Sequence, residues 1–212
     1  MNSKIKLLTI GLCSTLLFGC SSKTYTTIHN PNKNFKTTSI KTSHKQDACK
    51  MLQENPDWLY AIKRTSDKWN TPMSIQLSFV YHESSFVYNA RPIKKRKGYA
   101  FGTEYASSAL GFSQALNGAW GDYKKEQKPV KAMRTNFGDS VDFIGWYNSK
   151  SHKIGIKPTD AFNLYLAYHE GRRGWQKGYH KKQKWLLNYA KSVQKKSEVY
   201  SKQINQCKLR IN

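Results

Sequence analysis

Apolar residues recur at helical spacing in this chain from Cys49 onward. Asn55-Pro56-Asp57 combines a capping residue, a proline suited to a first turn and a first-turn acid, so it predicts a helix that continues to about Trp69. Thr71-Pro72 repeats this start. The helix that follows should be buried and should end near residues 81–85, because it is too apolar for a surface helix: Met73, Ile75, Leu77, Phe79 and Val80.

Three further helices are predicted in the second half of the chain. Asp139 is the expected cap of the first, and Thr159 is the expected cap of the second, which Gly171 should stop. The last helix is long and begins at about Lys182. Residues 89–107 contain proline, glycine and a basic run, and predict a loop or a short hairpin. We therefore expect a mainly α fold.

The N-terminal residues predict an export signal. Two lysines precede a mostly apolar run from Leu7 to Phe18, and twelve helical residues span about 18 Å, too little for a hydrocarbon core of roughly 30 Å. Residues 1–19 are therefore interpreted as a signal peptide.

The end of this signal, Leu17-Phe18-Gly19-Cys20, resembles the lipobox of bacterial lipoproteins. The resemblance implies that Cys20 becomes the lipidated first residue and anchors the protein to a membrane. Ser21 is not the aspartate associated with inner-membrane retention, which favours the outer membrane facing the periplasm. Ordinary cleavage near Gly19 remains the alternative.

Residues 20–48 are rich in Ser, Thr, Asn and Lys without an apolar period, and predict a flexible tether after the lipidated cysteine. The helical domain then occupies residues 49–212. Cys49 and Cys207 lie near its two ends, and an oxidising periplasm would allow them to form a disulfide, although two reduced cysteines remain the alternative. No cysteine spacing indicates a metal site.

The charge of the chain indicates an anionic partner. Its 36 Lys and Arg residues exceed its 13 Asp and Glu residues, giving a formal net charge of +23. Lysine dominates, whereas arginine is the residue preferred for bidentate recognition of bases and phosphates. We therefore expect diffuse attraction to an anionic polymer of the cell envelope rather than nucleic-acid binding, with part of the lysines serving only solubility.

Glu83 is the strongest candidate for chemistry. It ends the predicted buried helix and has Tyr81, His82 and Phe86 as neighbours in the sequence. A carboxyl group held among apolar and aromatic groups has a raised pKa and can act as a general acid near neutral pH. The alternative is a solvated glutamate at a helix end. A zinc helix is excluded here, because Phe86 stands where the second histidine of that motif would be needed.

Three segments in order resemble the motifs of lytic transglycosylases with the soluble-lytic-transglycosylase (SLT) domain: Glu83-Ser84, Ala109-Leu110-Gly111-Phe112-Ser113-Gln114 and Leu166-Ala167-Tyr168-His169-Glu170-Gly171. The resemblance covers roughly residues 55–200 and is greatest to the small lipoprotein branch, whose fold is lysozyme-like. It implies Glu83 as catalytic acid/base, Ser84 as a supporting hydroxyl, and Gln114 and Tyr168 as groups facing the sugar. It implies no metal or organic cofactor.

The resemblance also implies the reaction. Lytic transglycosylases cleave the MurNAc–GlcNAc β-1,4 bond of peptidoglycan with one carboxylate, and the C6 hydroxyl of the substrate closes onto the anomeric carbon to give a 1,6-anhydro end. Phe112-Ser113 and His169 depart from the usual motif residues. Two alternatives therefore stay open: a muramidase similar to goose-type lysozymes, and a wall-binding lipoprotein without turnover. Glu170 and Asp122 are candidate second carboxylates, whose alternative role is capping or salt bridging.

Aromatic residues provide candidates for stacking against sugars. Trp175 lies beside glycines and is the preferred substrate-binding candidate, whereas Trp146 is expected in the core because it lies on an apolar helix face. The remaining groove candidates are Trp120, Tyr123, Tyr147 and Tyr179. The partner expected from this set is a peptidoglycan glycan strand, bound by a monomer.

Overall fold

A computed structural model describes residues 42–93, 105–207 and 209. These residues form seven α-helices and two short 3-10 helices, and their only strand-like pairings are two isolated β-bridges. The prediction of a mainly α fold is confirmed. The predicted signal peptide, Cys20 and most of the predicted tether lie outside the described residues. None of the described helices combines the length and apolar character that a membrane crossing requires.

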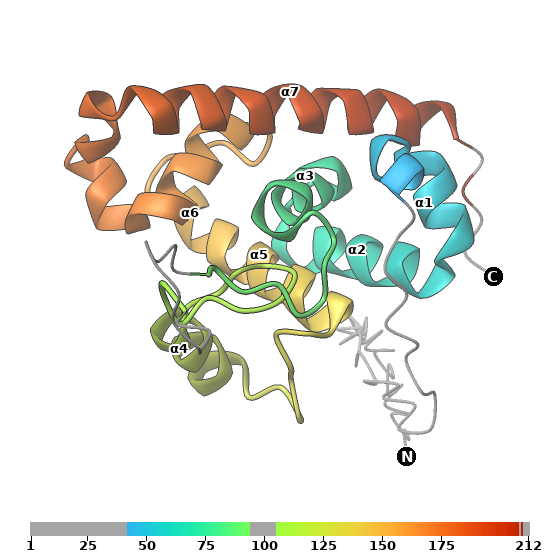
Figure 1. Cartoon of the computed structure of the whole chain (residues 1–212), viewed down its shortest axis with the longest axis horizontal. Coiled ribbons are helices and arrows are strands. Elements are labelled where there is room, and N and C mark those ends of the chain that lie inside the picture. The colour runs from blue at the N-terminus through green and yellow to red at the C-terminus, as the bar shows by residue number, and fades with distance from the viewer. Residues whose placement is uncertain (1–41, 94–104, 208, 210–212) are drawn as a thin grey trace, which may run out of the picture. The chain divides into compact units, whose positions relative to one another are not determined.

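The first two predicted helices are present as α2 (Pro56–Trp69) and α3 (Met73–Ser84). Helix α3 lies at the centre of the domain (Figure 1), and all of its residues from Ser74 to Val80 are buried, whereas Met73 is half-buried. It ends where Ser85 adopts a left-handed conformation with φ 50°. This end places Glu83 in the last turn of a helix that the core holds on nearly every side.

Helix α5 (Phe137–His152) packs against α2. Gly145 permits this approach, because a Cβ atom there would lie 2.6 Å from the Thr65 side chain. The predicted cap of this helix is wrong. Asn136 is the cap, and its side chain accepts the backbone N–H of Asp139 at 3.0 Å. Asp139 instead lies in the first turn, where its carboxylate accepts the N–H of Met133 at 2.9 Å.

The predicted cap of helix α6 (Ala161–Gln176) is wrong by one residue. Asp160, not Thr159, is the cap, and its side chain accepts the N–H of Asn163 at 2.9 Å. Gly171 interrupts the helix with φ 75° and ψ 150°. Helical turns resume after it, so the predicted stop is a kink. A 3-10 helix, η2 (Tyr179–Lys182), then leads into the long α7 (Lys184–Gln206).

Helix α4 (Asn117–Gln127) is not predicted by the sequence. Its Trp120 and Tyr123 are buried in the core, and the Tyr123 hydroxyl donates to Asp142 on α5 at 2.6 Å. The same carboxylate accepts Trp69 Nε1 of α2 at 2.8 Å. This buried carboxylate therefore fixes α4 to the α2–α5 pair.

The predicted loop or hairpin of residues 89–107 is only partly described. Ile93 and Tyr105 form an antiparallel bridge, so the two ends of the segment are paired. Residues 94–104 lie outside the described residues.

Helix α7 runs along one side of the domain and contacts α3, α6 and α1 (Ala48–Glu54) (Figure 1). Cys49 of α1 and Cys207 at the end of α7 form a disulfide with a Cα–Cα distance of 5.6 Å, as predicted. The 3-10 helix η1 (Thr42–Gln46) also packs here, and the Gln46 carbonyl accepts Gln203 Nε2 at 2.9 Å. Residues 42–48, which the sequence assigned to the tether, are therefore part of the described domain.

Candidate active site

The second sequence motif forms a tight loop whose ends, Leu110 and Ala115, are bridged. Gly111 begins the turn with φ 77°, and a Cβ atom there would lie 1.9 Å from the Arg134 carbonyl oxygen. Because backbone cannot yield at that distance, only glycine fits this position. Arg134 also holds the loop from outside, since its carbonyl accepts the N–H of Phe112 at 3.3 Å.

Two hydroxyl groups bring the three motifs together at this loop. Ser84 Oγ donates to the Phe112 carbonyl at 2.9 Å. Tyr168, on α6, donates its hydroxyl to the Ser113 carbonyl at 2.6 Å. The end of α3, the loop and α6 are thereby joined through backbone carbonyls. In this geometry both hydroxyls position the loop. This agrees with the supporting role expected of Ser84, whereas Tyr168, expected to face the sugar, donates its hydroxyl to the protein.

Gln114 closes the same loop from within. Its backbone is left-handed, with φ 48°. Its Nε2 donates to the carbonyls of Ala90 and Gly111, each at 2.9 Å. The amide nitrogen of Gln114 is therefore already hydrogen-bonded within the protein.

Glu83 lies in the last turn of α3, partly buried against α6. Burial raises the pKa of its carboxyl group from 4.5 to about 7, and a hydrogen bond from the Tyr165 hydroxyl opposes this rise by favouring the ionised form. A carboxyl group with this pKa is partly protonated at neutral pH. It can donate a proton and, once ionised, can accept one.

Three tyrosines surround this carboxyl group. Burial raises the pKa of Tyr165, Tyr168 and Tyr189, and the negative charge of Glu83 is the second largest cause of the rise in each case. All three hydroxyls therefore stay protonated. Phe79 contacts the rings of both Tyr165 and Tyr168 edge-to-face, with centroids 5.3 Å apart in each pair. The Tyr189 ring lies 5.6 Å from that of Tyr165. The site is thus a carboxyl group in an aromatic setting, with the Tyr165 hydroxyl as its hydrogen-bond donor.

Tyr165 and Tyr189 were not among the predicted site residues. Tyr165 precedes Tyr168 by one helical turn, and this spacing could have indicated that both tyrosines lie on one face of α6. Tyr189 comes from α7, and nothing in the local sequence indicates that it reaches Glu83.

Trp175 has its described contacts outside this site. Its Nε1 donates to Asn163 Oδ1 at 3.0 Å, and its ring stacks on His180 with centroids 6.4 Å apart. Trp146 is buried, as predicted. Trp120 and Tyr123 are wrong as groove candidates, because 6% and 1% of their surfaces are exposed.

The two candidate second carboxylates lie elsewhere. Asp122 is exposed on α4. Glu170 follows Tyr168 on α6, and its carboxylate lies 3.3 Å from the Nδ1 of His169. Neither contributes to the raised pKa of Glu83. Within the described residues, no group of three or more His, Cys, Asp and Glu side chains could hold a metal ion.

The comparison with known protein families agrees with the three joined motifs. A family described as the transglycosylase SLT domain matches residues 8–207. Neither curated proteins nor solved structures give a significant match to the chain. Because the match spans nearly the whole sequence and the described domain is mainly helical, the chain belongs to the transglycosylase SLT domain family, whose fold is lysozyme-like and whose members act on peptidoglycan glycan strands.

Proposed function

We propose that this protein is a lytic transglycosylase that cleaves the MurNAc–GlcNAc β-1,4 bond and leaves 1,6-anhydroMurNAc ends. One observation carries the proposal: burial raises the pKa of Glu83 to about 7, while the two candidate second carboxylates lie elsewhere, Asp122 exposed on α4 and Glu170 beside His169. Hydrolytic glycosidases ordinarily need two carboxylates, one to protonate the leaving oxygen and one to activate water or form a covalent adduct. A single carboxyl group suits a reaction in which the substrate supplies the nucleophile.

The reaction then follows from the two protonation states of Glu83. The protonated carboxyl group donates its proton to the glycosidic oxygen as the bond from that oxygen to the anomeric carbon breaks. The resulting carboxylate accepts the proton of the C6 hydroxyl, whose oxygen forms the new bond to the anomeric carbon. Tyr165 hydrogen-bonds the ionised form between the two transfers. No water is consumed, and Glu83 ends in its starting state.

Digestion of purified sacculi tests this proposal. The full-length protein should release muropeptides that weigh about 18 Da less than hydrolysed ones, because no water is added to the new end. Reducing ends alone would establish the muramidase alternative. Sacculi that bind the protein without releasing products would establish the wall-binding alternative.

The pKa of Glu83 predicts the pH dependence of the rate. Because the first step needs the protonated acid, the rate at low substrate concentration should be constant well below pH 7 and fall about tenfold per pH unit above it. A Tyr165→Phe variant removes a hydrogen bond that lowers this pKa, so its falling limb should move to higher pH. Initial rates of muropeptide release across pH measure both effects. A limb centred near pH 4.5 would contradict the assignment.

We also propose that the protein is held at the cell envelope, in the outer membrane facing the periplasm. The lipobox-like segment Leu17-Phe18-Gly19-Cys20 supports this localisation. Cells expressing a Cys20→Ser variant should release most of the protein into the soluble periplasmic fraction, since lipidation of Cys20 is the proposed anchor. Fractionation and immunoblotting measure the distribution. A variant that sediments with membranes as the wild type does would contradict lipidation at Cys20.

A further inference from the structure

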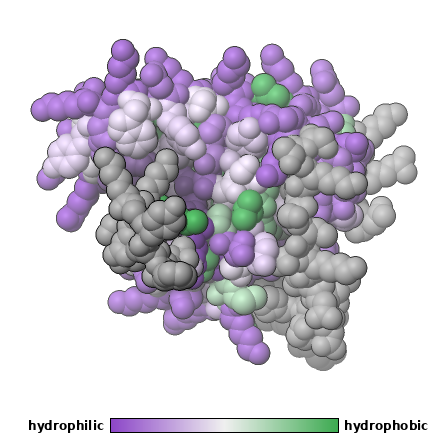
Figure 2. Space-filling view, in the orientation of Figure 1, coloured by the Kyte–Doolittle hydropathy of each residue, from purple (hydrophilic) through white to green (hydrophobic). Residues whose placement is uncertain are grey.

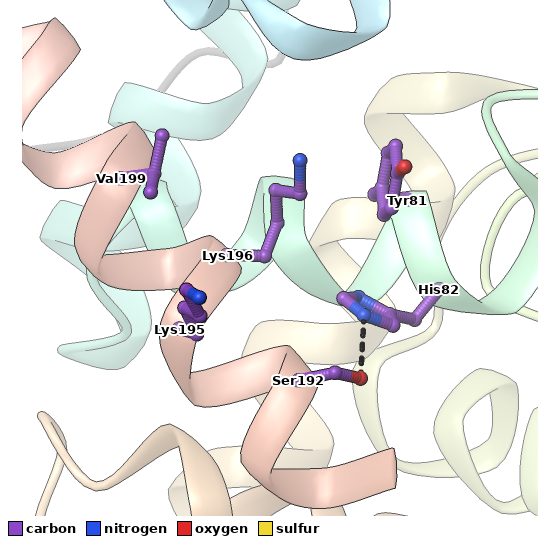
Figure 3. Close-up of a pocket in the computed structure, with 6 residues that line it drawn as sticks. All are labelled: Tyr81, His82, Ser192, Lys195, Lys196 and Val199. Carbon is purple, nitrogen blue, oxygen red and sulfur yellow. Dashed lines mark hydrogen bonds between the residues drawn. The ribbon is translucent and has the colours of Figure 1, made fainter.

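A pocket lies between the end of α3 and the middle of α7, next to the candidate active site. Its volume is about 350 Å³, and it is lined by Tyr81, His82, Ser192, Lys195, Lys196 and Val199. Figure 3 shows the α3 residues facing those of α7, with the Lys196 side chain extending toward the space beside Tyr81. His82 directly precedes Glu83, so the pocket begins one residue from the candidate acid.

The charge of this pocket is positive and uncompensated. Lys196 Nζ lies 4.3 Å from the centroid of the Tyr81 ring, and its hydrogen-bond partner is the neutral Gln46 side chain. Lys195 is exposed. In the part of the chain that the structure describes, no acidic side chain lies within ion-pair distance of either lysine.

The remaining polar groups of the pocket are neutral and already held. His82 Nδ1 pairs with the Ser78 carbonyl at 2.8 Å, and its Nε2 lies 3.1 Å from Ser192 Oγ. Burial, and to a lesser extent the charge of Lys196, lower the pKa of His82. The positive charge that a ligand meets near neutral pH therefore comes from the two lysines. An anion with an apolar stem is complementary to these ammonium groups, the Tyr81 ring and Val199.

A direct chain of contacts joins the pocket to the candidate active site. The Tyr189 hydroxyl donates to the His82 carbonyl at 2.7 Å. Burial is the largest cause of the raised pKa of Tyr189, and the charge of Glu83 is the second. The carbonyl oxygen of Tyr189 lies 2.6 Å from Ser192 Oγ, the same oxygen that lies beside His82 Nε2. A ligand bound at Glu83 therefore lies within one or two side chains of the pocket. A peptide of four residues reaches at most about 14 Å.

We propose that this pocket binds a carboxylate of the peptide side chains that peptidoglycan carries, while the glycan strand lies at Glu83. This inference rests on the proposed function. The peptides are attached to the same sugar whose bond would be cleaved, and they carry free carboxylates. A lysine pair beside the site would then favour peptide-bearing strands over strands without peptides.

The test compares two substrates with the full-length protein: glycan strands with intact peptides, and the same strands after an amidase has removed the peptides. A Lys195→Gln/Lys196→Gln variant, which lowers the charge by two, should raise KM about tenfold on peptide-bearing strands, the loss expected for one charge-assisted contact, with kcat unchanged. It should leave KM on peptide-free strands unchanged. A Lys196→Arg variant keeps the charge and should retain most of the wild-type KM.

Lys202→Glu is the matched control. Lys202 is exposed on the same helix, about 10 Å further along its axis from Lys195. An equal rise of KM in this control, or an equal rise on both substrates, would overturn the proposal, because general attraction would explain it. Loss of binding to phosphatidylglycerol vesicles without a change on glycan strands would overturn it in favour of a membrane contact.

The two proposals fail in different ways. If the wild type cleaves neither substrate, the proposed function is wrong, and co-sedimentation with peptide-bearing and peptide-free strands still tests the pocket. Weaker binding of the lysine variant to peptide-bearing strands alone would then support it. Equal binding of variant and wild type to both would overturn it.

Discussion

A Glu83→Gln variant should lose between about 10²- and 10⁴-fold of the rate of muropeptide release, the contribution typical of a positioned acid/base. Glutamine is close to glutamate in shape but can neither donate the acid proton nor accept one from the C6 hydroxyl. Both proton transfers of the proposed reaction depend on this one group. The measurement is the initial rate on sacculi, with binding to sacculi determined in parallel.

The same variant should remain folded. Because burial raises the pKa of Glu83 from 4.5 to about 7, the folded state holds this proton more tightly than the unfolded state does. The stability so gained is complete below pH 4.5 and is lost as the pH rises through 7. At pH 8 the variant should therefore equal or exceed the wild type, by up to about 3 kcal/mol.

Asp122→Asn serves as the matched control for this experiment, because Asp122 is an exposed carboxylate on α4. It should keep wild-type activity. Full activity in Glu83→Gln would contradict the proposed chemistry and would direct attention to Glu170 as the acid.

Replacing both Cys49 and Cys207 with serine should lower the free energy of unfolding by about 2–5 kcal/mol. The disulfide closes a sequence separation of 158 residues, and the entropy that it removes from the unfolded chain grows with loop length. For a domain of this size the expected fall in Tm is on the order of 10 °C. Thermal unfolding followed by circular dichroism measures it.

Reductant provides the control for this experiment. The wild type treated with a reducing agent should unfold at the temperature of the double variant, and the double variant should not respond to the reductant. Equal Tm values for oxidised wild type and double variant would show that the disulfide contributes nothing to stability.

The sequence predicts best the helices that carry their own signals. Asn55-Pro56 and the apolar residues of α3 identify two helices at their observed places. The cap predicted at Asp139 is misplaced because Asn136 is an equally good capping residue nearby, and the cap predicted at Thr159 is misplaced because the adjacent Asp160 is a better one. Helix α4 has weak signals, including two glycines, and burial of Trp120 and Tyr123 stabilises it instead.

In the candidate site too, the sequence predicts the residues that belong to motifs and misses those that only tertiary packing brings there. The motif residues Glu83, Ser84 and Tyr168 meet in space, because the motif order reflects a shared fold. Tyr189 could not be predicted, since only the packing of α7 against α3 brings it to His82 and Glu83. The glycines around Trp175 predict a place in the groove, whereas its contacts with Asn163 and His180 depend on the kinked path of α6.

The pairing of the two ends of the domain has a consequence for folding order. The carbonyl of Lys45 accepts the Tyr200 hydroxyl, and the Ala48 N–H donates to Gln203 across 155 residues of sequence. The first helices therefore lack part of their packing surface until α7 has been synthesised. Contacts of such long sequence separation slow folding, because their closure entropy must be overcome before they form. A chain that ends before α7 should therefore fold incompletely and be cleaved readily by proteases.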